Sequence, residues 1–114
     1  MGDCLFCSIA AGEISSQKVY SDDDFFAFRD INPQAPTHIQ LIPRKHFSTI
    51  LDIEEEDAAL MGRMLMVANE ISEKEGIAGE GVRYVINCNA GAGQTVFHIH
   101  LHIVGGRPLG WPPG

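Results

Sequence analysis

The sequence has little positive charge. Among its 114 residues, eight are lysine or arginine and fifteen are aspartate or glutamate, so the formal net charge is −7. Proteins that bind nucleic-acid polymers or anionic membranes need a net basic face, and this composition therefore argues against both kinds of partner. A few local donors can still hold a small anion such as a phosphate group, whatever the net charge of the chain. We therefore expect a small-molecule site.

Long hydrophobic runs and a disulfide framework are also missing. No apolar run approaches the roughly 20 residues that cross a bilayer, and Asp3 stands where a secretory signal would carry basic residues. The three cysteines are an odd number, which suits a reducing compartment better than a set of disulfides. These absences predict a cytoplasmic protein without a membrane partner.

The chain is organised as one small domain over residues 1–114, because the length leaves no room for a second domain and no repeat or linker interrupts it. Glycine, proline and acidic residues divide the first half into short elements. The expected elements are a helix over 4–11, a hairpin of strands 19–21 and 25–29 around the acidic turn 22–24, a loop over 32–36 and a strand over 38–42.

One long helix is expected to begin at Asp52 and to end near Gly76. Asp52 suits an N-cap, with Glu55 three residues on for a capping box. Apolar residues then recur at helical spacing; they are Leu60, Met64, Val67 and Ile71, and Met61, Leu65 and Ala68 widen the stripe. A stripe this wide on a short chain leaves a dimer interface open as well as a core.

Two further strands are expected over 82–88 and 96–104, joined across a glycine-rich loop over 89–93. Several strands and one dominant helix, without regular strand–helix alternation, indicate the α+β class. We predict a mostly antiparallel sheet of about five strands with one long helix and a short N-terminal helix.

Three histidines alternate with apolar residues near the C-terminus, in the run His98-Ile99-His100-Leu101-His102. In a strand these imidazoles share one face, each roughly 6.5–7 Å from the next, while the apolar side chains anchor the other face in the core. Such an array can ligate a metal ion, as three-histidine zinc sites do. It can also attack phosphorus with one imidazole while a neighbouring imidazole supplies the proton that the leaving group needs.

The loop before the histidines favours the phosphorus chemistry. Residues 91–95 combine two glycines with Gln94 and Thr95, so that backbone N–H groups and a hydroxyl can approach an anion. The loop matches neither the dinucleotide-binding fingerprint nor a Walker loop. Its position directly before the histidines is what connects it to phosphate.

Cys4 and Cys7 have the spacing of half a zinc site. Zinc needs two further ligands, and two small apolar residues on a short helix explain the pair equally well. A thioredoxin-type redox role is disfavoured, because the strand–helix–strand context of that motif is absent.

These motifs resemble the histidine-triad (HIT) superfamily over nearly the whole chain. Residues 98–103 are similar to its His-x-His-x-His motif, residues 30–38 to its upstream segment, and residues 93–97 to the lead-in before the histidines. The endings 105–107 and 111–114 resemble the Hint branch rather than the dinucleoside-polyphosphate hydrolases. The resemblance implies a single HIT domain and a homodimeric hydrolase that cleaves purine nucleoside 5′-phosphoramidates, or related aminoacyl-adenylates, through a nucleotidyl-histidine intermediate and without a catalytic cofactor.

The resemblance also implies roles for single residues. His100 would be the nucleophile, His102 would contact the phosphate, and His98 and His38 would support the imidazoles. Asp30 would accept hydrogen bonds from the ribose hydroxyls. Further residues would complete the nucleotide site: Asn87, Gly93, Gln94 and Thr95 near the phosphate, Phe6, Ile9, Phe28 and Ile31 as an apolar slot for the base, and Trp111 on a tail that approaches the partner's site.

Some members of the superfamily bind structural zinc through a Cys-x-x-Cys pair and two histidines. The matching residues here would be Cys4, Cys7, His46 and His98, and zinc ligation would make His98 structural. Three other functions stay open at this point. They are a dinucleotide hydrolase or nucleotidyl transferase of the same superfamily, a nucleotide-binding interaction module with incidental catalysis, and a zinc-dependent hydrolase that uses the histidines as ligands.

Overall fold

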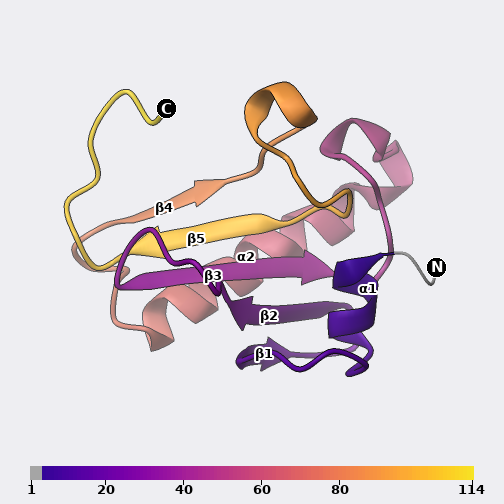
Figure 1. Ribbon diagram of the computed structural model, residues 1–114, viewed down its shortest axis with the longest axis horizontal. Helices are drawn as coiled ribbons and strands as arrows, with labels where there is room; N and C mark the ends of the chain where they lie inside the picture. Colours follow the sequence, from indigo (N-terminus) through magenta and orange to yellow (C-terminus); the bar gives the residue numbers. More distant parts are fainter. Residues whose placement is uncertain (1–3) are drawn as a thin grey trace.

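The computed structural model describes residues 4–114 and contains a five-stranded sheet with one helix on each face (Figure 1). The strands are β1 (Lys18–Ser21), β2 (Phe25–Arg29), β3 (Thr37–Pro43), β4 (Val82–Val85) and β5 (Leu101–Gly105). They lie in the order β1-β2-β3-β5-β4, and every neighbouring pair is antiparallel. The long helix α2 (Ala58–Lys74) covers one face, and the short helix α1 (Leu5–Ala10) lies against the other. The predicted α+β class is confirmed.

Alternation along the strands gives the sheet two different faces. Phe25 and Ala27 of β2 belong to the main core under α2, whereas Phe26 and Phe28 join a second, smaller cluster with the apolar side of α1. The same alternation along β3 and β5 leaves polar side chains on the α1 face. This face therefore carries the candidate site.

The predicted hairpin is confirmed, with β1 and β2 antiparallel on either side of the acidic run. The Asp22 carboxylate accepts hydrogen bonds from the backbone N–H groups of Asp24 and Phe25, at 2.8 and 2.7 Å. The Tyr20 hydroxyl donates to the same carboxylate at 2.7 Å, and this bond raises the pKa of Tyr20 to about 12. The acidic run is thus a turn held by its first carboxylate.

The prediction that Asp52 caps the long helix is wrong. Residues 50–57 form two short 3₁₀ turns, Ile50–Asp52 and Glu55–Asp57, and α2 begins only at Ala58. Asp52 closes the first of these turns, because its carboxylate accepts from the backbone N–H of Thr49 at 3.0 Å. On α2 itself, Met64, Val67, Ala68 and Ile71 are buried, while Leu65 is 48% exposed. Among residues 4–114, no helix is both long and apolar enough to cross a membrane.

The predicted strands 82–88 and 96–104 are both too long. β4 ends at Val85, and β5 begins only at Leu101. Residues 96–100 do not form a strand; among them, the Ile99 backbone N–H donates to the Phe47 carbonyl at 2.8 Å. Only His102 of the three histidines therefore lies in a strand, and the three do not share one strand face.

Candidate active site

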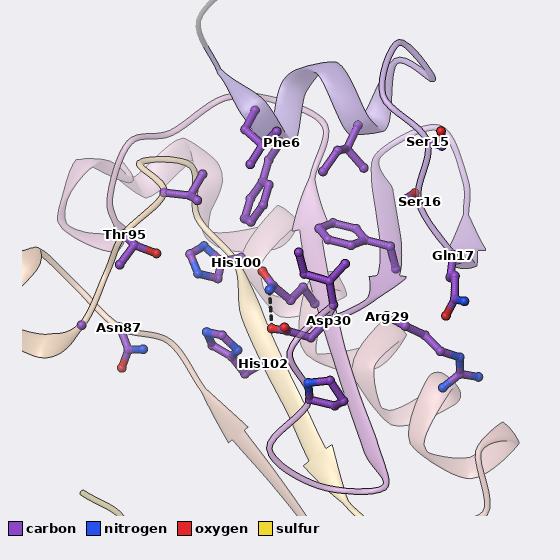
Figure 2. Close-up of a pocket in the computed structure, with 18 residues that line it drawn as sticks. Phe6, Ser15, Ser16, Gln17, Arg29, Asp30, Asn87, Thr95, His100 and His102 are labelled. Atoms are coloured by element: carbon purple, nitrogen blue, oxygen red, sulfur yellow. Dashed lines mark hydrogen bonds between the residues drawn. The ribbon is translucent and has the colours of Figure 1, made fainter.

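A cavity of about 980 Å³ opens on the α1 face of the sheet (Figure 2). Its lining comes from α1, the segment before β1, the end of β2 and its following loop, and β3. The other side comes from the segment after β4, residues 93–100, and β5. In Figure 2, His100 and His102 lie between Thr95 and Asn87 on one side and Asp30 on the other. The lining residues are Leu5, Phe6, Ile9, Ser15, Ser16, Gln17, Phe28, Arg29, Asp30, Ile31, Pro33, Gln40, Asn87, Gly93, Thr95, Val96, His100 and His102.

His100 has a fixed tautomer. Its Nδ1 lies 2.8 Å from the carbonyl oxygen of His98, and a carbonyl can only accept, so Nδ1 carries the hydrogen. The lone pair therefore sits on Nε2, at the opposite end of the ring. Burial lowers the pKa of His100, and the rings of Phe6 and His100 pack edge to face with centroids 5.0 Å apart. A neutral imidazole with a free Nε2 lone pair is the form that acts as a nucleophile.

A second chain of hydrogen bonds fixes His102. The backbone N–H of Gln34 donates to Nδ1 of His38 at 3.0 Å, which leaves the His38 hydrogen on Nε2. That Nε2 lies 2.9 Å from Nδ1 of His102 and donates to it, so the hydrogen of His102 is on its own Nε2. His100 and His102 line the same cavity in opposite states, since one offers a lone pair and the other offers a hydrogen.

The pKa of His102 is lowered to about 4, first by burial and then by the neighbouring imidazoles of His100 and His38. The folded protein thus holds this ring neutral, while the unfolded chain takes up a proton below pH 6.5. Because the unfolded state binds more protons between pH 6.5 and 4, the free energy of unfolding falls as the pH drops through this window.

We expect His102→Gln to remove this part of the acid sensitivity. The ring is partly exposed, so the loss between pH 7 and pH 5 that it causes in the wild type is about 1 kcal/mol. Urea unfolding of both proteins at the two pH values measures the difference. Equal losses of stability in the two proteins would show that this imidazole does not carry the effect.

Asp30 is held in place at the cavity wall. Its Oδ1 accepts the backbone N–H of Asn32 at 2.8 Å, and its Oδ2 accepts Nε2 of Gln40 at 2.6 Å, the bond drawn as a dashed line in Figure 2. Nε2 of His38 is 3.5 Å from the same Oδ2. Gln40 was not among the predicted site residues; the signal for it was a polar residue on the same strand face as His38.

The structure brings together the four residues of the expected apolar slot, Phe6, Ile9, Phe28 and Ile31. Phe6 and Phe28 pack edge to face with centroids 5.4 Å apart. Ile31 is the outermost of the four, since its side chain is fully exposed. An aromatic floor with an apolar rim suits a flat ring such as a nucleobase.

The loop residues divide into two groups. Asn87, Gly93 and Thr95 line the cavity, but Gln94 is buried behind the loop and does not. Nε2 of Gln94 donates to the carbonyl of Ser48 at 2.8 Å, and its Oε1 accepts the backbone N–H of Asn89 at 2.7 Å. Gln94 therefore shapes the loop from beneath. Trp111 is 84% exposed and lies outside the lining of this single chain.

His98 points away from the cavity and into a second cluster with Cys4, Cys7 and His46. Nδ1 of His98 lies 3.3 Å from Sγ of Cys4, 3.5 Å from Sγ of Cys7 and 3.1 Å from Nδ1 of His46. Sγ of Cys7 is also 3.5 Å from Nδ1 of His46. Nε2 of His98 donates to the carbonyl of Pro43 at 2.7 Å, which leaves the Nδ1 lone pair facing the cluster.

This cluster has the dimensions of a tetrahedral zinc site. With Zn–S near 2.3 Å and Zn–N near 2.05 Å, tetrahedral angles require about 3.6 Å between sulfur and nitrogen and about 3.3 Å between the nitrogens. The distances within the cluster are within a few tenths of an ångström of these values. The hydrogen bond from His98 to Pro43 is the outer support that zinc-ligating imidazoles usually have.

The profile of the HIT domain family matches residues 11–109. The purine nucleoside phosphoramidase of Escherichia coli K12 is 50% identical over 108 residues, which cover 95% of this chain and 91% of that protein. The crystal structure of a HIT family hydrolase from Legionella pneumophila superposes with a TM-score of 0.97 at 50% identity, over 98% of this chain and 100% of that one.

A more distant structure shares the fold. A histidine triad nucleotide-binding protein from Candida albicans superposes with a TM-score of 0.81 at 28% identity, over 96% of this chain and 83% of that one. The overall fold is thus retained across large changes in sequence.

Proposed function

This chain belongs to the HIT family, and on that premise we propose that it hydrolyses the P–N bond of purine nucleoside 5′-phosphoramidates, or the related bond of aminoacyl-adenylates. The observation that carries the proposal is the opposite tautomers of His100 and His102 at one cavity wall. A nucleophile and a hydrogen donor side by side are what a displacement at phosphorus requires. The relative named above as a purine nucleoside phosphoramidase supports the class of substrate.

The first step forms a bond from Nε2 of His100 to phosphorus and breaks the bond to the leaving amine. The His100 ring becomes cationic as its lone pair is used, and the Nδ1 hydrogen bond to the carbonyl of His98 stabilises that charge. The amine leaves with the electron pair of the P–N bond and must gain a proton. Solvent in the cavity supplies that proton, because a neutral imidazole that gave up its N–H would become an anion. Nε2–H of His102 instead donates a hydrogen bond to the phosphate, and the 2.9 Å contact with His38 keeps that hydrogen on Nε2.

Water then breaks the bond between phosphorus and His100, which releases the nucleoside monophosphate and restores the lone pair. No metal takes part in either step of this route. Thr95 would donate its hydroxyl to the phosphate or the leaving group, and Gly93 and Asn87 would contact the phosphate beside it. Asp30 would accept from the ribose hydroxyls, with Phe6, Ile9, Phe28 and Ile31 around the base.

Turnover of adenosine 5′-phosphoramidate tests the proposal, with ³¹P NMR following the conversion to AMP. We expect AMP as the product, and we expect the rate to exceed that on a dinucleoside polyphosphate. The opposite order of rates would move the protein to the dinucleotide hydrolases. Binding of AMP without turnover of either substrate would make it a nucleotide-binding module.

We also propose that Cys4, Cys7, His46 and His98 hold one structural zinc ion. Burial, followed by the hydrogen bond with Cys4, raises the pKa of the Cys7 thiol to about 11 in the metal-free protein. A bound zinc ion would keep both sulfurs as thiolates. It would also link α1 to His98 and so to the segment that carries His100. His98 would then act only by placing its carbonyl against His100.

We propose further that the working unit is a cytoplasmic homodimer of one HIT domain per chain, residues 1–114. Leu65 and Met66 on the outer side of α2 are 48% and 69% exposed, and β4 is an edge strand. Arg83 of β4 donates to the carbonyl of Gly110 at 2.7 Å, which holds the tail of Trp111 beside that edge. Such apolar exposure favours burial against a second copy.

Sedimentation velocity of the full chain should therefore give a dimer, and Met66→Glu should weaken it by placing a charge in the interface. Deleting residues 110–114 should change the preference among leaving groups if the tail reaches the partner's site. A wild-type monomer at micromolar concentration would contradict the dimer.

A further inference from the structure

Gln40 is a polar residue in the middle of β3 that lines the cavity. In the sheet it lies opposite Phe28 of β2 and opposite His102 of β5. Its two chain neighbours, Ile39 and Leu41, are fully buried in the main core under α2. The carboxamide of Gln40 is therefore carried by a rigid part of the sheet and placed between the base slot and the imidazoles.

The nitrogen and the oxygen of this carboxamide differ in their hydrogen bonding. Nε2 donates to Oδ2 of Asp30 at 2.6 Å. Oε1 is buried, and within residues 4–114 it is the single buried side-chain nitrogen or oxygen that has no hydrogen-bond partner. The reverse orientation of the amide would place two acceptors 2.6 Å apart, so the assignment of the two atoms is fixed by Asp30.

An unpaired buried acceptor is costly, and native proteins rarely keep one without a reason. An apolar side chain at this position would avoid the cost. The donor that can reach Oε1 is one that enters from the cavity, because the terminal torsion of a glutamine is soft and lets the amide turn. A hydroxyl of a bound ligand is such a donor.

Once the amide turns toward a ligand, Oε1 of Gln40 and the oxygens of Asp30 together offer acceptors to the cavity. A carboxylate has about four lone-pair sites, and Asn32 and Gln40 each use one of them. Each oxygen of Asp30 thus keeps room for another donor, and Oε1 of Gln40 adds a third acceptor. Two adjacent hydroxyls match this arrangement, since each of them can donate to a different acceptor.

We propose that Gln40 is a specificity-determining residue that selects a ribose with both its 2′- and 3′-hydroxyls. It does so by holding Asp30 through Nε2 and by accepting one sugar hydroxyl on Oε1 while Asp30 accepts the other. The inference rests on the proposed function, because it takes the ligand to be a nucleoside phosphate. A site built to bond a hydroxyl rejects the analogue that lacks it, since its buried polar atoms stay unpaired.

Binding of AMP, 2′-deoxy-AMP and 3′-deoxy-AMP to the wild type and to Gln40→Met tests the proposal by calorimetry. Methionine keeps the unbranched shape but has no donor, and its thioether sulfur is only a weak acceptor. We expect the wild type to bind AMP more tightly than both deoxy ligands. The two ratios of AMP affinity to the affinity for each deoxy ligand measure this preference. In Gln40→Met at least one of them should shrink by about tenfold, which is about 1.4 kcal/mol. The ratio of AMP to GMP affinity is the control within each protein and should not change.

Unchanged ribose-to-deoxyribose ratios in Gln40→Met would overturn the proposal, as would equal binding of AMP and the deoxy ligands by the wild type. Gln40→Leu provides a second variant if the methionine protein does not fold. Since binding is read without turnover, the two proposals can fail separately. Hydrolysis of phosphoramidates with unchanged ratios refutes only the role of Gln40. If the ribose-to-deoxyribose ratios change in Gln40→Met but the wild type hydrolyses no phosphoramidate, the role of Gln40 is upheld and only the proposed reaction is refuted.

Discussion

Replacing His100 by alanine should lower kcat for adenosine 5′-phosphoramidate by about 10³-fold or more, because the reaction loses the group that bonds to phosphorus. AMP should still bind, since Asp30, the apolar slot and His102 remain at the cavity. The effect should therefore fall on kcat and leave KM within a few-fold. Turnover of the variant at the wild-type rate would exclude a covalent intermediate on this residue.

Chemical rescue separates a lost nucleophile from a damaged fold. In His100→Gly, free imidazole can occupy the vacated space beside Phe6, whose ring packs on His100 at 5.0 Å. Added imidazole should restore part of the activity in proportion to its concentration, and 1-methylimidazole and imidazole should differ because only one of them can donate to the carbonyl of His98. Mass spectrometry of quenched wild-type reactions should find the nucleotide on His100. Loss of activity without rescue and without an adduct would point to a structural role.

The alternating histidines show how far the sequence predicts the site. Their spacing predicts a cluster of imidazoles beside the glycine-rich loop, and two of the three do line one cavity. The strand assigned to them is wrong before Leu101, because residues 96–100 are held by a bond from Ile99 to Phe47, far back in the sequence. Local alternation carries no information about that contact. His98 is turned into the cysteine cluster as a result.

The two glutamines illustrate a second limit. Gln94 lies in the predicted loop and would be expected to face the ligand, but its side chain hydrogen-bonds the loop backbone and Ser48. Gln40 lies in a predicted strand, and only the register of β3 between β2 and β5 shows that its carboxamide meets Asp30. Residue type and spacing locate a site, whereas the direction of each polar side chain depends on neighbours that are distant in sequence.

The prediction that the long helix begins at Asp52 failed for a similar reason. Thr49 with Asp52, and Glu54 with Asp57, are two capping boxes in succession, and both cap 3₁₀ turns. A sequence pattern identifies such a box but does not say whether the turn that follows it continues as an α-helix. The apolar spacing after Ala58 was the more reliable signal, since it reports the burial of Met64, Val67 and Ile71 against the sheet.

Loss of either thiolate from the proposed zinc site should have the largest effect on stability. The free energy of metal coordination is part of the folding free energy at such a site, so Cys4→Ser or Cys7→Ser should lower the stability by about 3 kcal/mol or more. For a chain of this size, that corresponds to a fall in Tm of roughly 10 °C or more. Metal analysis should give one zinc ion per wild-type chain and much less in either variant.

Cys88→Ser is the matched control, because Cys88 is also partly buried but lies outside both the cluster and the cavity lining. It should keep the zinc and a Tm within a few degrees of the wild type. Cys4 caps α1 and Cys7 lies on it, while Phe6 and Ile9 of the same helix line the cavity, so the two cluster variants should also bind AMP more weakly. A wild type purified without zinc, whose Tm is unmoved by added zinc or by a chelator, would refute the metal and leave the four side chains as a hydrogen-bonded cluster. Because the proposed displacement at phosphorus runs through His100 and His102 and not through the cysteine cluster, any chelator effect on activity should follow the loss of folded protein and never precede it.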